Sequence, residues 1–94
     1  MKDVLIYWDR NVFDGKIRRL PSNLILYTQI YNIDKNSWSL IFKFDTPPCI
    51  QGYETIGKVD FLVKDAPKNI LIDNFEFDFL DGKKIIGKCK IIDW

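Results

Sequence analysis

The chain has 94 residues, of which 47% are hydrophobic, and it carries a formal net charge of +1 at pH 7. This length and composition predict a single folded domain over residues 1–94 and exclude a disordered chain. Because the charge is near neutral, there is no overall attraction to polyanions, and nucleic-acid binding would need a local basic patch.

The N-terminus does not resemble a secretion signal. Met1-Lys2-Asp3 places an acidic residue before a very short apolar run, and no small-residue cleavage site follows. Every apolar run is far shorter than the roughly 20 residues that span a bilayer. We therefore expect a cytoplasmic protein without a membrane partner. Isoleucine, lysine and asparagine exceed alanine and arginine, which suggests an AT-rich, bacterial coding genome.

Composition and alternation both indicate strands in the first half of the chain. Ala66 is the sole alanine, whereas β-branched and aromatic residues are abundant, as is typical of β structure. Four strands are expected, at residues 3–8, 12–20, 24–33 and 37–44. The second of them contains Asp14-Gly15, which offers an alternative turn. The third and fourth are joined by the tight turn Asp34-Lys35-Asn36 and form a hairpin.

The second half begins with a rigid loop at Asp45-Thr46-Pro47-Pro48, because proline cannot join a central ladder. Residues 49–56 show no clear pattern, and a turn is expected at Gly52. Gly57–Lys64 alternates as a strand, and Ile70–Ile72 is expected to form a short strand before the final hairpin. No helix longer than one turn is predicted.

The strongest local signal is the alternation of apolar and polar residues on both sides of a glycine turn in the last third of the chain, Asn74 to Trp94. A two-residue Asp81-Gly82 loop would place lysine on the apolar face. A three-residue loop that also includes Lys83 keeps the faces separate. It pairs Phe79 with Ile85, Phe77 with Gly87, and Phe75 with Cys89. We therefore expect this loop, with Gly87 leaving room for the ring of Phe77. The whole pattern predicts an all-β fold, a small antiparallel β-barrel of six or seven strands.

The run from Phe75 to Ile91 resembles the end of the C-terminal β-barrel of elongation factor Tu. That family ends in an apolar–x–Phe–x–apolar strand, an acid–Gly turn, a basic residue, an apolar–Gly pair and a last alternating strand. Phe77, Gly82 and Gly87 keep this spacing without gaps. Upstream segments from Gly52 onward extend the resemblance, so that it covers about residues 52–92. It implies a closed barrel similar to that of the family.

The resemblance does not bring the family's activity with it. In that family GTP hydrolysis belongs to a separate domain with a phosphate-binding loop, and this chain has no G-x-x-x-x-G-K-[ST] run among its five glycines. The family's barrel helps to hold tRNA and the exchange factor, but the residues that do so lie mainly where this chain departs from the pattern. No binding residue is therefore carried over.

The residues that usually carry catalysis or bind metals are scarce. The chain has no histidine, which removes the commonest general base and metal ligand. Asp9, Asp14 and Asp60 could in principle form a carboxylate site, but such aspartates usually form turns. Cys49 and Cys89 are too few for a structural zinc site without histidine. Cys89 is expected to pack in the core, and a disulfide between the two would require export. We expect no enzyme, no metal and no cofactor.

Exposed aromatic and basic side chains are the candidate binding groups. The six residues singled out are Tyr27, Tyr31, Lys84, Lys88, Lys90 and Trp94. A second basic cluster near the N-terminus contains Arg10, Lys16, Arg18 and Arg19. Together these groups could form a stacking-and-phosphate surface for RNA. The alternative is a solvated barrel exterior, on which Glu76 and Asp78 face the lysines across the hairpin.

Several apolar residues fall on the phase opposite to the core or in loops. They are Tyr27, Tyr31, Tyr53, Ile41, Leu62 and Ile86. Exposed together, such residues would mark a protein interface. We expect a small stand-alone, non-catalytic module that binds another protein, in an immunity- or antitoxin-like role. A barrel that binds RNA or the translation machinery is the alternative, and a carboxylate-based enzyme or enzyme subunit is a third possibility. The oligomeric state is left open.

Overall fold

The computed structural model describes residues 1–33, 36–66 and 68–92, and within them six strands, one α-helix and one 3₁₀ helix. In chain order the elements are β1 (Lys2–Trp8), β2 (Ile25–Ile33), β3 (Asn36–Lys43), α1 (Pro48–Gln51), β4 (Glu54–Phe61), η1 (Lys68–Ile70), β5 (Glu76–Asp81) and β6 (Lys84–Ile91). β5 and β6 form the final hairpin expected in the last third of the chain.

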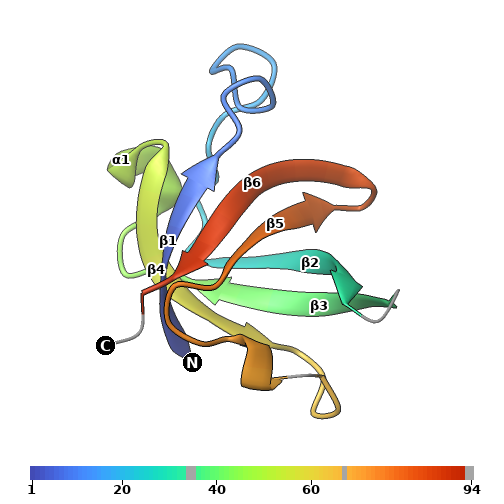
Figure 1. Ribbon diagram of the computed structural model, residues 1–94. Coiled ribbons are helices and arrows are strands. Elements are labelled where there is room, and N and C mark those ends of the chain that lie inside the picture. Colours follow the sequence, from blue (N-terminus) through green and yellow to red (C-terminus); the bar gives the residue numbers. More distant parts are fainter. Residues whose placement is uncertain (34–35, 67, 93–94) are drawn as a thin grey trace.

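The described strands close into an antiparallel barrel in the order β1-β4-β3-β2-β5-β6 (Figure 1). β2, β3 and β4 follow one another as a meander, and β1 lies beside β4 although the connection 9–24 separates β1 from β2. This is a Greek-key arrangement. The predicted all-β barrel is confirmed, with six strands.

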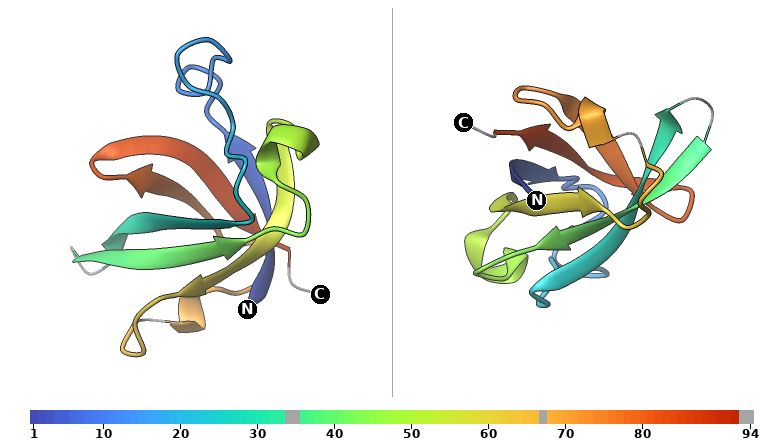
Figure 2. Two further views of the ribbon diagram at one scale, coloured as in Figure 1. Left: turned by 180° about the vertical axis from the view of Figure 1, so that it is seen from behind. Right: turned by 90° about the horizontal axis from the view of Figure 1, so that it is seen from below.

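Most strands pair over five residues or more, but β2 and β5 meet over only two pairs, Gln29 with Leu80 and Ile30 with Phe79. The barrel therefore closes least extensively between β2 and β5. Figure 2 shows that the connection 9–24 extends beyond the end of the barrel at which α1 lies. The segment that includes η1 lies at the opposite end (Figure 1).

Aromatic rings fill the centre of the barrel. Trp8 packs edge-on against Phe13 and Phe79, with ring centroids 5.2 and 5.4 Å apart, and Phe42 packs edge-on against Phe79 at 5.1 Å. Edge-to-face packing of this kind is favourable for aromatic pairs. Alternation along β3 buries Leu40 and Phe42, as its pattern predicts. The core thus joins β1, β3, β5 and the connection 9–24.

The unassigned residues 49–56 divide into α1 and the start of β4. Pro48 occupies the first turn of the helix, where proline's missing N–H is tolerated. The helix ends at Gly52, whose φ of 100° suits glycine. The Gln51 amide then donates to the carbonyls of Thr46 and Ile56 at 2.7 and 3.0 Å and accepts from the Ile56 N–H at 2.9 Å. The two bonds with Ile56 tie α1 to β4, and the bond to Thr46 ties it to the preceding loop.

Two predicted strands are absent from the described residues. Residues 12–20 form an irregular connection, because the Asp14 side chain accepts hydrogen bonds from the backbone N–H groups of Lys16 and Ile17. Such local side-chain bonds compete with a strand ladder. The strand predicted at Ile70–Ile72 is also wrong. Residues 68–70 form η1, and the Ile72 N–H donates a hydrogen bond to the Ile70 carbonyl.

The closing hairpin keeps the expected faces at Phe77, Phe79 and Cys89, but its register differs and the faces of Ile85 and Ile86 are exchanged. Its turn consists of two residues, Gly82 and Lys83, flanked by the pair Asp81–Lys84. Farther along, Phe79 lies opposite Gly87, Phe77 opposite Cys89, Asp78 opposite Lys88 and Glu76 opposite Lys90. The predicted three-residue loop is wrong because Ile86 is an extra, buried residue in β6, and this bulge absorbs the phase difference. Gly82 has φ of 65°, as the first position of a type II′ turn requires.

Candidate functional site

The structure does not gather the predicted binding side chains that it describes into one patch. Tyr27 lies on β2, and Tyr31 is also in β2, but its side chain lies outside the described part. Lys84, Lys88 and Lys90 lie on β6. Trp94 lies outside the described residues. Because β5 separates β2 from β6 in the barrel, the tyrosine and the lysines form two different surfaces.

The first surface is apolar. Tyr27 is 64% exposed and lies opposite Ile41, a half-buried residue of β3. Ile25, on the same outer face of β2, is 44% exposed. We call Ile25, Tyr27 and Ile41 the Tyr27 patch. Exposed aromatic and aliphatic side chains that adjoin each other are the usual mark of a protein contact.

Other residues of the predicted apolar set lie elsewhere. Leu62 is 52% exposed just after β4, whereas Tyr53 is partly buried beside the connection 9–24. Ile86 is buried, at 2% exposure, because the bulge turns it inward, so its predicted exposure is wrong. Of the predicted apolar set, Tyr27 and Ile41 are therefore the two residues that the structure describes side by side on the outer face of the β2–β3 hairpin.

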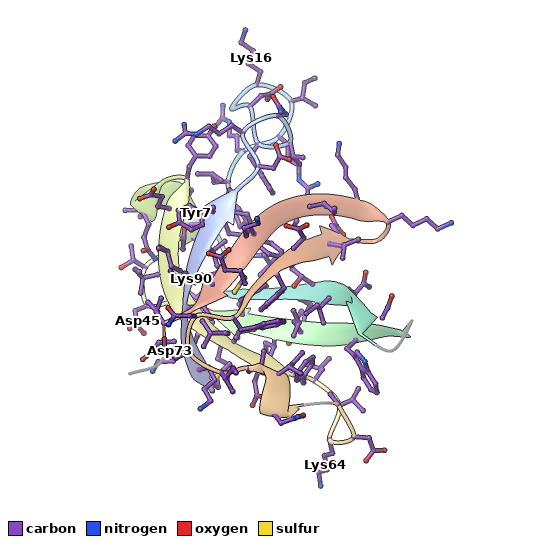
Figure 3. The ribbon with its side chains drawn as sticks, viewed as in Figure 1. Tyr7, Lys16, Asp45, Lys64, Asp73 and Lys90 are labelled. Atoms are coloured by element: carbon purple, nitrogen blue, oxygen red, sulfur yellow. The ribbon has the colours of Figure 1, made fainter. Side chains whose placement is uncertain are left out.

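The second surface, on β6, has mixed charge. Lys88 lies between Asp78 of β5 and Tyr7 of β1, and Lys90 lies between Glu76 and Leu5. Lys84 is paired with Asp81. Each lysine thus has an acid directly opposite, which reduces the positive potential that RNA phosphates would need. Figure 3 shows Tyr7 and Lys90 on this side of the barrel.

A third surface is the exposed turn at Asp14-Gly15, which the sequence offered as an alternative to a strand over residues 12–20. Ile17 is 93% exposed. The Asp14 carboxylate accepts from the N–H groups of Lys16 and Ile17 at 2.8 and 2.9 Å, and Gly15 N–H donates to the Arg18 carbonyl. These backbone hydrogen bonds lower the pKa of Asp14, and the bond from Lys16 has the largest effect. We call residues 14–18 the Ile17 tip, and its Lys16 points away from the barrel (Figure 3).

The Ile17 tip is attached to the barrel by buried and stacked groups. Phe13 is 1% exposed, and its carbonyl accepts a hydrogen bond from the Tyr53 hydroxyl. The Arg18 guanidinium lies 4.8 Å from the centre of the Phe13 ring and 2.9 Å from the Asp81 carboxylate. Arg10 stacks on Tyr53 at 4.2 Å. The rings thus hold two of the arginines in place.

Charge is concentrated at this end of the molecule. Residues 9–24 and 81–84, which the Arg18–Asp81 ion pair joins, contain six basic and three acidic residues, a net charge of +3, so the rest of the chain carries −2. We call these two segments the basic end. The predicted cluster of Arg10, Lys16, Arg18 and Arg19 belongs to it, and so does Lys84, whereas Lys88 and Lys90 do not.

A groove of about 420 Å³ lies where β1, β4 and β3 run side by side. Lys43 and Lys58 are directly opposite each other there, and Lys58 forms an ion pair of 3.1 Å with Asp3. Asp45 also lines the groove. Two lysines and two aspartates leave it without net charge, and the groove lacks an arrangement of nucleophile and base.

The candidate catalytic aspartates do not meet. Asp9 follows one end of β1, whereas Asp60 lies beyond the pair Lys2–Val59 at its other end. The length of β1 therefore separates them by roughly 20 Å. Among the described residues there is no group of three metal-binding side chains of the His, Cys, Asp or Glu type. Cys49 and Cys89 are both free thiols, exposed and buried respectively, so the core position predicted for Cys89 is confirmed.

The fold and these surfaces define the class of the molecule as a small closed β-barrel with exposed apolar groups. Comparisons with protein-family models, with curated proteins and with solved structures found no match. The resemblance to elongation factor Tu over residues 52–92 thus has no support from a family or a homologue. No helix in the described ranges has the length and apolar character that a membrane crossing requires.

Proposed function

We propose that the protein is a non-catalytic module that binds another protein, and that the Tyr27 patch is part of its interface. The observation that carries this proposal is the exposure of Tyr27, at 64%, on a barrel that buries most of its other aromatic rings. A tyrosine offers large contact area at a small entropic penalty, and tyrosine is enriched at sites that dominate binding energy.

An immunity- or antitoxin-like role, in which the module neutralises or regulates a partner in the cytoplasm, fits a small domain without catalytic groups. This part of the proposal is an analogy at the level of protein class. The mixed charge of the β6 face supports it, because a protein interface tolerates neighbouring acids and lysines better than a phosphate-binding surface does.

Cross-linking at defined positions tests the proposal. A photoreactive phenylalanine analogue at position 27 should yield a discrete protein adduct in the cells that encode the chain, and the same analogue at position 88 should not. With the partner purified, Tyr27→Ala should weaken binding by about tenfold or more, or about 1.4 kcal/mol. Lys88→Ala is the matched control and should change the affinity little. Equal affinities for wild type and Tyr27→Ala would reject the Tyr27 patch.

A second candidate is a barrel that binds RNA or the translation machinery. The net charge of +3 at the basic end favours it, as does the resemblance of residues 52–92 to the elongation-factor barrel. RNA binding should weaken steeply between about 50 and about 200 mM salt. It should weaken further when Lys84, Lys88 and Lys90 are all replaced by glutamine. Binding of a protein, with RNA left unbound, would decide for the first candidate.

A further inference from the structure

The Ile17 tip is built to present one aliphatic side chain. Ile17 is 93% exposed, although three hydrogen bonds within residues 14–18 hold the turn and Gly15 adopts φ of 82°. The buried Phe13 anchors the segment to the core. A loop whose backbone is already ordered loses less conformational entropy on binding than a flexible loop does. The order of this turn therefore favours a role for Ile17 as an anchor.

The surroundings of Ile17 select a partner by charge. The basic end has a net charge of +3 against −2 for the rest of the chain. Lys16 and Arg19 lie on either side of Ile17 in the chain and are exposed, and Arg10 is held over the Tyr53 ring. Complementary charge around an apolar anchor accelerates association and suppresses wrong partners. The complementary surface is acidic with an apolar pocket at its centre.

RNA fits this end less well than an acidic protein does. Bases bind single-stranded readers by stacking on open aromatic rings. Here Phe13 is 1% exposed and Tyr53 lies beneath Arg10. The exposed group is an isoleucine, which offers no flat face for a base.

An anionic membrane also fits less well. Even a single fatty acyl chain gives only marginal membrane binding, and stable attachment takes two such signals. Ile17 buries far fewer methylene groups than an acyl chain, and a net charge of three adds only modest attraction. A pocket that surrounds the side chain uses the same isoleucine more fully.

We propose that the basic end is a docking surface for a protein whose acidic surface surrounds an apolar pocket, and that Ile17 fills this pocket. The proposal rests on the protein-binding function proposed above and names the chemistry of the partner. It adds a contact separate from the Tyr27 patch, so the two can be tested apart.

The experiment places the photoreactive phenylalanine analogue at position 17 and, in separate proteins, at position 27. The expected result is an adduct through position 17 whose cross-linked peptide lies in an acidic region of the captured protein. With that protein purified, Ile17→Ser should weaken binding by about tenfold or more. Replacing Lys16 and Arg19 by glutamine should weaken binding and reduce its dependence on salt.

Two matched controls lie at the other end of the barrel. Ile72, which is 62% exposed, and Lys64, seen opposite Lys16 in Figure 3, lie outside the basic end. Ile72→Ser and Lys64→Gln should leave the affinity unchanged. Circular dichroism and thermal unfolding should show that each variant is folded. Ile17→Ser in particular should keep the wild-type stability, because Ile17 contributes little to the core.

The cross-linking results at positions 17 and 27 distinguish this inference from the proposed function. An adduct through position 27 and none through position 17 overturns this inference and leaves the proposed function standing, whereas no adduct at either position overturns both. Ile17-dependent binding to phosphatidylcholine vesicles with about 30% phosphatidylserine, or to single-stranded RNA, also overturns it. So does sedimentation that reports Ile17-dependent self-association.

Discussion

Gly87 lies directly opposite Phe79 in the β5–β6 ladder, and the Phe79 ring occupies the space that a side chain at position 87 would need. A Cβ atom on residue 87 would lie 2.6 Å from Cζ of Phe79 and 2.8 Å from the carbonyl oxygen of Tyr7. Phe79 is fully buried and packs against Trp8 and Phe42. The glycine therefore lets β6 approach the central rings closely enough to close the barrel.

Gly87→Ala should destabilise the fold. The Phe79 ring is buried against Trp8 and Phe42, and the Tyr7 carbonyl belongs to the backbone, so we expect neither neighbour to move without an energetic penalty. Overpacking of this kind costs about 1–3 kcal/mol. Urea unfolding should report this loss in the free energy of unfolding.

The neighbouring exposed residue is the control for that variant. Lys88→Ala should change the free energy of unfolding by no more than about 0.5 kcal/mol. In the background of Phe79→Leu, which frees space, Gly87→Ala should have a smaller effect, and a double-mutant cycle measures the difference. Wild-type stability of Gly87→Ala would disprove the close packing of Phe79 on Gly87.

Two buried threonines should respond in opposite ways to replacement by valine. The Thr55 hydroxyl accepts a hydrogen bond from the Trp8 indole N–H at 2.8 Å and donates to the Gly52 carbonyl at 2.9 Å. The Thr28 hydroxyl is buried without a hydrogen-bond partner in the described part of the chain. Thr55→Val should destabilise the protein by about 1–3 kcal/mol, because it leaves the indole N–H unsatisfied. Thr28→Val should be neutral or stabilising.

Urea unfolding of both variants under the same conditions tests this contrast. The two substitutions have the same chemistry and both positions are nearly inaccessible, at 0% and 4% exposure for Thr55 and Thr28. A difference in stability therefore reports the hydrogen bonds and not the change in volume. Equal destabilisation by both would contradict the contrast, and so would a larger loss for Thr28→Val.

Much of the fold could be predicted because period-two alternation is a local property of the chain. The buried face of β3 follows from it directly, and so do the faces of the closing hairpin apart from Ile85 and Ile86. The hairpin register was wrong because alternation cannot reveal a bulge, and two adjacent apolar residues, Ile85 and Ile86, satisfy either register. The neighbours of β1 depend on contacts between distant segments, which no local pattern encodes.

The candidate surfaces were predictable to different degrees. Tyr27 lies on the phase of β2 opposite to the buried Ile30, so its place on the outer face follows from the period of the strand. Ile17 shares its phase with Phe13, and as one strand they would have had the same environment. The Asp14-Gly15 turn separates them, so that Phe13 is buried and Ile17 is exposed. The turn signal was visible in the sequence, but its three-dimensional consequence was not.

The two thiols should differ sharply in reactivity. Cys49 is exposed at α1, whereas Cys89 is 0% exposed in the core, and burial raises the pKa of its thiol. In the native protein a disulfide reagent should therefore modify one thiol quickly, and in denaturant it should modify two. Cys49→Ser should remove the fast reaction. Two fast thiols in the native protein would contradict the burial of Cys89.

The Ile17 tip should lose its order in acid, at a pH below the ordinary pKa of aspartate. Hydrogen bonds from the N–H groups of Lys16 and Ile17 lower the folded-state pKa of Asp14 below its ordinary value of 3.8. A lowered folded-state pKa means that the bonds contribute fully above 3.8 and are lost as the pH falls through the folded-state pKa. The amide signals of Lys16 and Ile17 in an NMR titration should therefore shift with a midpoint below 3.8. Asp14→Asn, which keeps an acceptor oxygen but does not titrate, should abolish that shift, and a midpoint at or above 3.8 would contradict the hydrogen-bonded turn that holds Ile17 outward.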